Sequence, residues 1–249
     1  MKMRFVSCFI LLLFLSSDLS AQVAEGIITF NRKTNYISIA SKLPHVSQEE
    51  IDRMNLAWGD PADNEGTNYE LFFKADKSLY LEKKEQSDSG YSWKSGKFIL
   101  MRDYRGNTKE DLIETLGKVY HIKEDLPKTK WKILNEIKEV AGHLCMKAET
   151  TNELKGQVVH AWFTDAIPFA GGPEGYGGLP GMILELDIND QDAVITATSV
   201  KLDEAEVKLP YPKKIKGKKI EQAALDNIIK KYIDETLEGK KNPYWRVRY

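Results

Sequence analysis

The alternation of apolar and polar side chains between residues 182 and 188 most strongly constrains how this chain can fold. Every second residue of this segment is apolar, and carboxylates lie between them at positions 185 and 187. Successive side chains of a β-strand point to opposite faces, so the pattern predicts a strand with one buried and one solvated face. The inward residues are Met182, Leu184, Leu186 and Ile188. Such a strand is typical of an antiparallel sheet.

Shorter β patterns, separated by turn residues, surround this segment. Residues 144–150 and 158–164 flank a polar turn at 152–156, which predicts a hairpin. Residues 189–192 turn the chain again before a further strand at 194–202. Additional strands are expected at residues 26–30, 69–73, 78–82, 98–102, 119–124 and 131–133, and a loop at 84–96. The chain is therefore expected to be mainly β, with helices added (α+β).

Two segments have helical patterns. Residues 45–56 contain the capping-box pair Ser47 and Glu50. Residues 220–237 form an amphipathic helix with one apolar stripe, inside a C-terminal region that carries 11 basic and 5 acidic residues from 213 to 249. This region either packs on the sheet with a solvated basic face or makes peripheral contact with anionic lipid head groups.

The N-terminus has the layout of a secretory signal peptide. Lys2 and Arg4 precede an apolar stretch at residues 5–15, and Ala21 offers a small residue at the cleavage position. Eleven apolar residues at about 1.5 Å each span only about half of a hydrocarbon core of ~30 Å, which argues against a membrane anchor. We therefore expect residues 1–21 to be removed and the protein to be exported, to the periplasm or in association with the envelope.

The expected mature chain consists of a β-rich domain at residues 22–212 and a basic helix and tail at 213–249. Removal of residues 1–21 takes away two of 36 basic and one of 37 acidic residues, leaving 34 and 36. It also leaves one cysteine, Cys145, so an internal disulfide is impossible. No later stretch is long enough to span a membrane as a helix, and we expect no nucleic-acid partner.

A glycine-rich loop precedes the strand at 182–188. Six of the 17 glycines fall within residues 171–181. The loop contains neither a dinucleotide-binding pattern nor a phosphate-binding P-loop. Pro180-Gly181 suits a tight turn, so the loop is either a structural turn or a surface that faces a ligand or partner. The candidate residues are Gly172, Pro173, Tyr176, Gly178, Leu179, Pro180 and Gly181.

One set of residues offers a metal-site alternative. His143 and Cys145 share a strand face, and His160 lies on the facing strand of the predicted hairpin. In a suitable register these three side chains could hold Cu(I) or Zn. Burial of an inert thiol is the other interpretation of Cys145. No zinc-protease or nucleophile-elbow motif is present, so we expect a non-catalytic protein without a cofactor.

The segment from Trp131 to Leu186 resembles the GLPGLI family of exported proteins from two-membrane bacteria. The resemblance rests on Ala141–Ala148, Ala161–Thr164 and, above all, Gly178-Leu179-Pro180-Gly181-Met182-Ile183-Leu184-Glu185-Leu186. Met182 stands where the family name has Leu, which is a volume-conserving exchange. The resemblance implies export and a β-rich architecture. The layout is also similar to the curved antiparallel half-barrels, covered by a helix, of lipoprotein carriers.

These features predict an exported, non-catalytic binding protein with an apolar groove for a lipid, a lipidated partner or a peptide. The groove is expected beside Met182, Leu184 and Leu186, with the glycine-rich loop at its rim. One alternative is an interaction module for an outer-membrane receptor or transporter, which an exposed aromatic patch would favour. The other alternative is a metal-binding protein that uses His143, Cys145 and His160.

Overall fold

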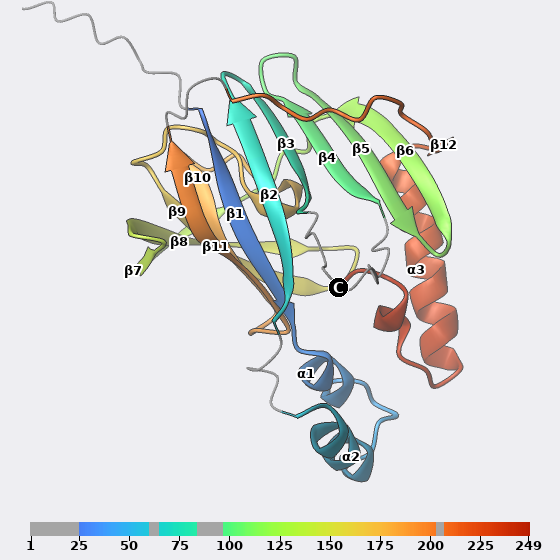
Figure 1. Cartoon of the computed structure of the whole chain (residues 1–249). Helices are drawn as coiled ribbons and strands as arrows, with labels where there is room; N and C mark the ends of the chain where they lie inside the picture. Colours follow the sequence, from blue (N-terminus) through green and yellow to red (C-terminus); the bar gives the residue numbers. More distant parts are fainter. Residues whose placement is uncertain (1–24, 60–64, 84–96, 203–206) are drawn as a thin grey trace, which may run out of the picture.

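The computed structural model describes residues 25–59, 65–83, 97–202 and 207–249. The predicted signal peptide and the whole of the predicted loop at 84–96 lie outside these ranges. The described strands form one curved, unclosed sheet of 12 strands in the order β12-β6-β5-β4-β3-β2-β1-β11-β10-β9-β8-β7 (Figure 1). All pairings are antiparallel except β12 with β6. The fold is thus mainly β, as predicted.

The strands and helices have the following bounds. The strands are β1 (Gly26–Thr34), β2 (Thr67–Lys74), β3 (Lys77–Glu82), β4 (Phe98–Asp103), β5 (Thr108–Thr115), β6 (Lys118–Asp125), β7 (Lys132–Val140), β8 (His143–Asn152), β9 (Gln157–Thr164), β10 (Met182–Ile188), β11 (Ala193–Leu202) and β12 (Lys218–Lys219). The helices are α1 (Tyr36–Ser41), α2 (Gln48–Trp58) and α3 (Gln222–Glu238), with short 3-10 turns η2 (Pro173–Gly175) and η3 (Pro243–Trp245). None of these helices is long and apolar enough to cross a membrane.

Local sequence signals account for several of these elements. Strand β10 begins and ends as its alternation predicts, and β8 and β9 form the predicted hairpin. Helix α2 begins at the predicted capping box: the Ser47 hydroxyl accepts from the Glu50 amide, and the Glu50 carboxylate accepts from the Ser47 amide. Helix α3 confirms the C-terminal helix.

Three elements are missing from the sequence prediction: α1, β5 and the two-residue strand β12. Helix α1 has only six residues, too few to show a helical period. Strand β5 places Lys109 and Asp111 at inward positions where an apolar residue is expected. Both charges are buried because they have polar partners, so a hydrophobic pattern cannot reveal this strand.

The main core fills the inner face of the sheet around β1, β2 and β8–β11. Residues Met182, Leu184 and Leu186 are each 0% exposed. The glycine-rich loop covers the start of β10 as well, since Gly172 packs against Ile183. These three strand residues therefore do not line an open groove, because the core buries their side chains completely.

Helix α3 covers the other end of the sheet. Its Leu225 packs on Tyr120 and Ile122 of β6. The chain then returns through η3 toward the sheet, where Tyr249 is buried and its hydroxyl donates to Asp192. Figure 1 shows α3 beside β6 and the last residue between the helix and the sheet. This return path leaves a space under α3 that the core does not fill.

Candidate functional site

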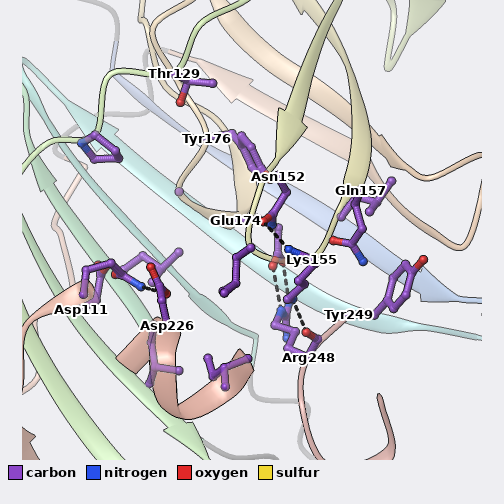
Figure 2. A pocket seen from close by; sticks show the side chains of 18 of the residues that line it. Asp111, Thr129, Asn152, Lys155, Gln157, Glu174, Tyr176, Asp226, Arg248 and Tyr249 are labelled. Atoms are coloured by element: carbon purple, nitrogen blue, oxygen red, sulfur yellow. Dashed lines mark hydrogen bonds and ion pairs between the residues drawn. The ribbon is translucent and has the colours of Figure 1, made fainter. Parts of the chain in front are cut away.

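The main cavity lies between the sheet and α3, and has a volume of about 1080 Å³. Most of its lining comes from six parts of the chain: strands β4 and β5, the segment 127–132, the hairpin turn 152–157, the loop residues 174–176, helix α3, and the C-terminal residues 246–249. Figure 2 shows Lys155, Glu174 and Arg248 on one side, with Asp111 and Asp226 on the other. The cavity therefore gathers residues that lie far apart in the sequence.

Apolar and aromatic side chains form part of the cavity wall. Phe98 and Ile113 contribute from the sheet, and Ile229 contributes from α3. At one rim, the Trp131 ring lies 6.0 Å from the Tyr176 ring, and its indole N–H donates to the Gly177 carbonyl at 2.9 Å. This hydrogen bond attaches the segment 127–132 to the glycine-rich loop.

The base of the cavity contains a buried ion pair between Glu174 and Arg248. The Arg248 Nε donates to the Glu174 carboxylate at 2.7 Å, and its Nη1 donates to the Tyr69 hydroxyl at 2.8 Å. The guanidinium also lies 4.1 Å from the centre of the Phe98 ring. Burial favours the neutral form of Glu174, but Arg248 and Arg32 outweigh burial and lower its pKa. Glu174 therefore remains ionised at neutral pH.

Lys155 enters this cluster from the turn between β8 and β9. Its ammonium donates to the backbone carbonyl of Arg248. Burial lowers the pKa of Lys155 to about 8, and the charges of Arg32 and Arg248 act in the same direction, while Glu174 opposes them. This amine is therefore close to its titration midpoint under mildly alkaline conditions.

A second buried charge cluster lies toward α3. Arg102 forms an ion pair with Asp111, and Lys109 donates to the Gln222 side chain at 2.6 Å. Burial is the main cause of a lowered pKa for Lys109, which the Asp111 carboxylate partly offsets. Buried charges carry a large desolvation cost, so their presence in both clusters marks this end of the sheet as chemically distinct from the apolar core.

The glycine-rich loop divides between structure and cavity. Tyr176 faces the cavity, as do the neighbouring Glu174 and Gly175. The other candidates, Gly172, Pro173, Gly178, Leu179, Pro180 and Gly181, do not line it. Gly181 is required by packing: a Cβ at this position would lie 2.0 Å from the Thr164 carbonyl oxygen.

The three residues of the metal-site alternative are not brought together. In the hairpin register His160 lies opposite Glu149, and their side chains contact at 3.2 Å. Cys145 is fully buried and lies four positions along β8 from that pair, while His143 sits beside the β7–β8 turn opposite Val140. Among the described residues, no group of three or more His, Cys, Asp or Glu side chains could hold a metal ion. The hairpin register thus separates the proposed ligands.

Sequence reasoning missed most of the polar cavity residues. Lys155 lies in a hairpin turn, where lysine is usually solvated, and its contact with Arg248 spans 93 positions in sequence. Glu174 stood inside the glycine-rich loop, where it has a φ of 56°. A non-glycine residue in this backbone region is a useful signal, but only a structure reveals it.

Comparisons with known proteins support the fold and leave the activity open. Residues 149–185 match the model of a family described as a protein of unknown function (Porph_ging). No curated protein matches the chain. Two solved structures of PNGF-II, in C2 and P21 space groups, are similar in fold, each with a TM-score of 0.54 and with 16% and 15% identity. The match covers 82% of this chain but only 32% and 33% of those chains, about a third of their length.

Proposed function

We propose that this chain is an exported, non-catalytic binding protein of the cell envelope that carries an amphipathic ligand in the cavity under α3. The ligand would be a lipid, a lipidated partner or a peptide. The observation that carries this proposal is the cavity itself, with its volume of about 1080 Å³, apolar walls and charged base. Small-molecule sites typically measure about 300–1,000 Å³ and combine apolar lining with a few placed polar groups.

The construction of the cavity supports a binding role. Phe98 and Ile113 offer apolar surface from the sheet, and Ile229 offers it from the facing helix. The Glu174–Arg248 pair holds the polar base in place through several hydrogen bonds. An amphipathic molecule could bury its apolar part against these walls, which is favourable by about 25 cal/mol per Å² of apolar surface.

The export part of this proposal rests on the N-terminal sequence. Residues 1–21 have the charge, apolar stretch and small residue of a signal peptide. The GLPGLI resemblance points the same way, and its motif at residues 178–186 overlaps the segment 149–185 that matches the family of unknown function. We therefore place the ligand in the periplasm or at the envelope.

Native mass spectrometry of the chain purified gently from the periplasm tests this proposal. A retained lipid or acylated peptide is the expected result. The variant Ile229→Trp, which fills the cavity from α3, should lose the retained mass. The control Lys231→Trp places the same side chain on an exposed position of α3 and should keep it. Retention that is equal in both variants would show that the molecule binds elsewhere, and an empty protein would overturn the carrier role.

A second candidate function is supported by an exposed aromatic patch that consists of Tyr36, Trp58 and Trp245, with the exposed Leu56 two residues before Trp58 on α2. The Trp245 ring stacks on Tyr36 with centres 5.3 Å apart and meets Trp58 edge-on at 5.4 Å. Both tryptophans are about half exposed, and Leu56 is 88% exposed. Tryptophan and tyrosine are enriched at protein interfaces, so the patch favours an interaction module for an outer-membrane receptor or transporter.

Site-specific crosslinking distinguishes this second candidate. A photoreactive residue at position 56 should capture one outer-membrane protein in intact cells. The same residue at position 49, also exposed on α2, serves as the matched control. Capture should disappear when Trp58→Ala and Trp245→Ala are combined. Equal capture from both positions would contradict a specific interface at the patch.

A further inference from the structure

The segment between β6 and β7 places three lysines at the mouth of the cavity. Lys128, Lys130 and Lys132 alternate with Thr129 and Trp131, and all five line the cavity. The three lysines are exposed, and none has an ion-pair or hydrogen-bond partner among the described residues. We call residues 127–132 the lysine strap. It carries three positive charges without a close ion-pair partner in the part of the chain that the structure describes.

The charged side chains that line the cavity carry a small net positive charge. Seven of them are carboxylates and nine are lysines or arginines, a balance of +2. The two buried carboxylates, Glu174 and Asp111, are already ion-paired with Arg248 and Arg102. The three lysines of the strap therefore make the balance of the lining positive.

Lys155 extends this positive surface into the cavity. Among the described residues, its ammonium has one hydrogen-bond acceptor, the backbone carbonyl of Arg248. Burial and the charges of Arg32 and Arg248 lower the pKa of Lys155, and Glu174 offsets them only in part. An anionic group beside Lys155 would favour its charged form.

We infer that the lysine strap and Lys155 bind the anionic end of an amphipathic ligand, a phosphate or carboxylate group. This inference rests on the proposed carrier function, because the apolar part of the ligand occupies the cavity wall of Phe98, Ile113 and Ile229. The strap lysines attract the anion at the mouth, and Trp131, tied to Gly177, keeps the strap beside the opening. Exposed charges are screened by salt, so binding should weaken as ionic strength rises.

Isothermal titration calorimetry with defined amphiphiles tests the inference. The probes are dodecyl phosphate, dodecyl maltoside and inorganic phosphate, each below its micelle concentration where one exists. Dodecyl phosphate should bind at least about tenfold more tightly than the neutral maltoside, which corresponds to about 1.4 kcal/mol. Inorganic phosphate should bind far more weakly, because it has no apolar part to bury.

Two variants with the same change in charge localise the effect. Lys128→Gln, Lys130→Gln and Lys132→Gln combined should weaken dodecyl phosphate binding about tenfold, with dodecyl maltoside unchanged. The control combines Lys213→Gln, Lys214→Gln and Lys216→Gln, which remove three exposed lysines that do not line the cavity. It should bind like the wild type. Lys155→Met keeps an unbranched apolar side chain but removes the charge. This variant should show a smaller preference for dodecyl phosphate over dodecyl maltoside than the wild type.

The outcomes separate the two proposals. Equal affinity for the phosphate and the maltoside would overturn the anion site and leave the carrier function intact. Equal loss in the strap variant and the 213–216 control would also overturn the anion site, since it would reduce the effect to overall charge. Inorganic phosphate that binds as tightly as dodecyl phosphate, or no binding of either amphiphile, would overturn the carrier function itself.

Discussion

The two ends of the sheet cover their inner face in different ways. Around β10 the chain packs its own glycine-rich loop against the strand, and residues such as Ile183 and Leu184 are completely buried. Around β4 to β6 the cover is α3, which contacts the sheet through Leu225 and leaves the cavity beside it. The first end is filled with apolar side chains, and the second end contains ion pairs, tyrosines and Lys155.

This contrast separates stability from binding. A close-packed apolar region gains free energy from every buried methyl group but leaves no space for a second molecule. Buried charges such as Glu174 and Arg102 add little net stability, since their desolvation offsets their attraction. Their presence beside an open volume is compatible with the binding function proposed above. The following variants test whether the two ends differ as this view requires.

The largest effect is expected at the packed end, from Gly181→Ala. The new Cβ would lie 2.0 Å from the Thr164 carbonyl oxygen, so the start of β10 would have to move away from β9. We expect a loss of about 4 kcal/mol in the free energy of unfolding, measured by urea denaturation. Gly178→Ala is the matched control. Its φ is also positive, at 88°, but nothing lies within 4 Å of its Cβ, so it should cost only about 1 kcal/mol. Equal losses would contradict close packing as the cause.

At the open end, Glu174→Gln should cost about 3 kcal/mol, because it leaves Arg248 and Arg32 without their shared counter-charge. The folded state lowers the pKa of Glu174, so its contribution is present above the unfolded pKa of about 4.3 and is lost as pH falls through the folded value. The difference in the free energy of unfolding between wild type and variant should therefore shrink in strong acid. Urea denaturation from pH 7 down to pH 3 measures this difference. A difference that does not change with pH would contradict an ionic origin.

The sequence predicts best the elements that local patterns define, whichever end of the sheet they belong to. The alternation in β10 and the capping box of α2 are local patterns, and each depends on side chains a few positions apart. Such patterns are visible without knowledge of the fold. The C-terminal helix was predictable for the same reason, since its apolar stripe repeats with the helical period.

Strand β5 and the polar residues of the cavity escaped prediction because their interactions are long-range. Strand β5 lacks an apolar alternation because Lys109 and Asp111 occupy buried positions. Their partners come from β4 and α3. Lys155 meets Arg248 only because the β8–β9 turn and the C-terminal segment converge in the folded chain. Sequence spacing cannot show such convergence. Met182, Leu184 and Leu186 are buried in the core and do not line an open groove, since alternation reveals a buried face but not what covers it.

A smaller effect tests the environment of Lys155. Its folded pKa of about 8 lies below the unfolded value of about 10.4, so the unfolded chain binds more protons between these limits. Stability should therefore rise by about 1 kcal/mol from pH 7 to pH 9, relative to Lys155→Met, which lacks the titrating group. Urea denaturation at both pH values measures this rise. Lys97→Met, at an exposed lysine on the cavity rim, is the control and should follow the wild type. A parallel rise in Lys155→Met would show that another group titrates.

The smallest effect concerns Cys145 at the packed end. Burial raises the pKa of this thiol to about 11, and its side chain is 0% exposed. Only the thiolate reacts with disulfide reagents, so Ellman's reagent at pH 8 should label Cys145 slowly in the folded protein and at once in urea. Cys145→Ala should cost about 1 kcal/mol, as expected for a small buried group. Rapid labelling without denaturant would mean that the sheet opens around β8. The two ends would then differ in charge but not in packing. This result would contradict the view that the packed end stabilises the fold while the open end binds a ligand.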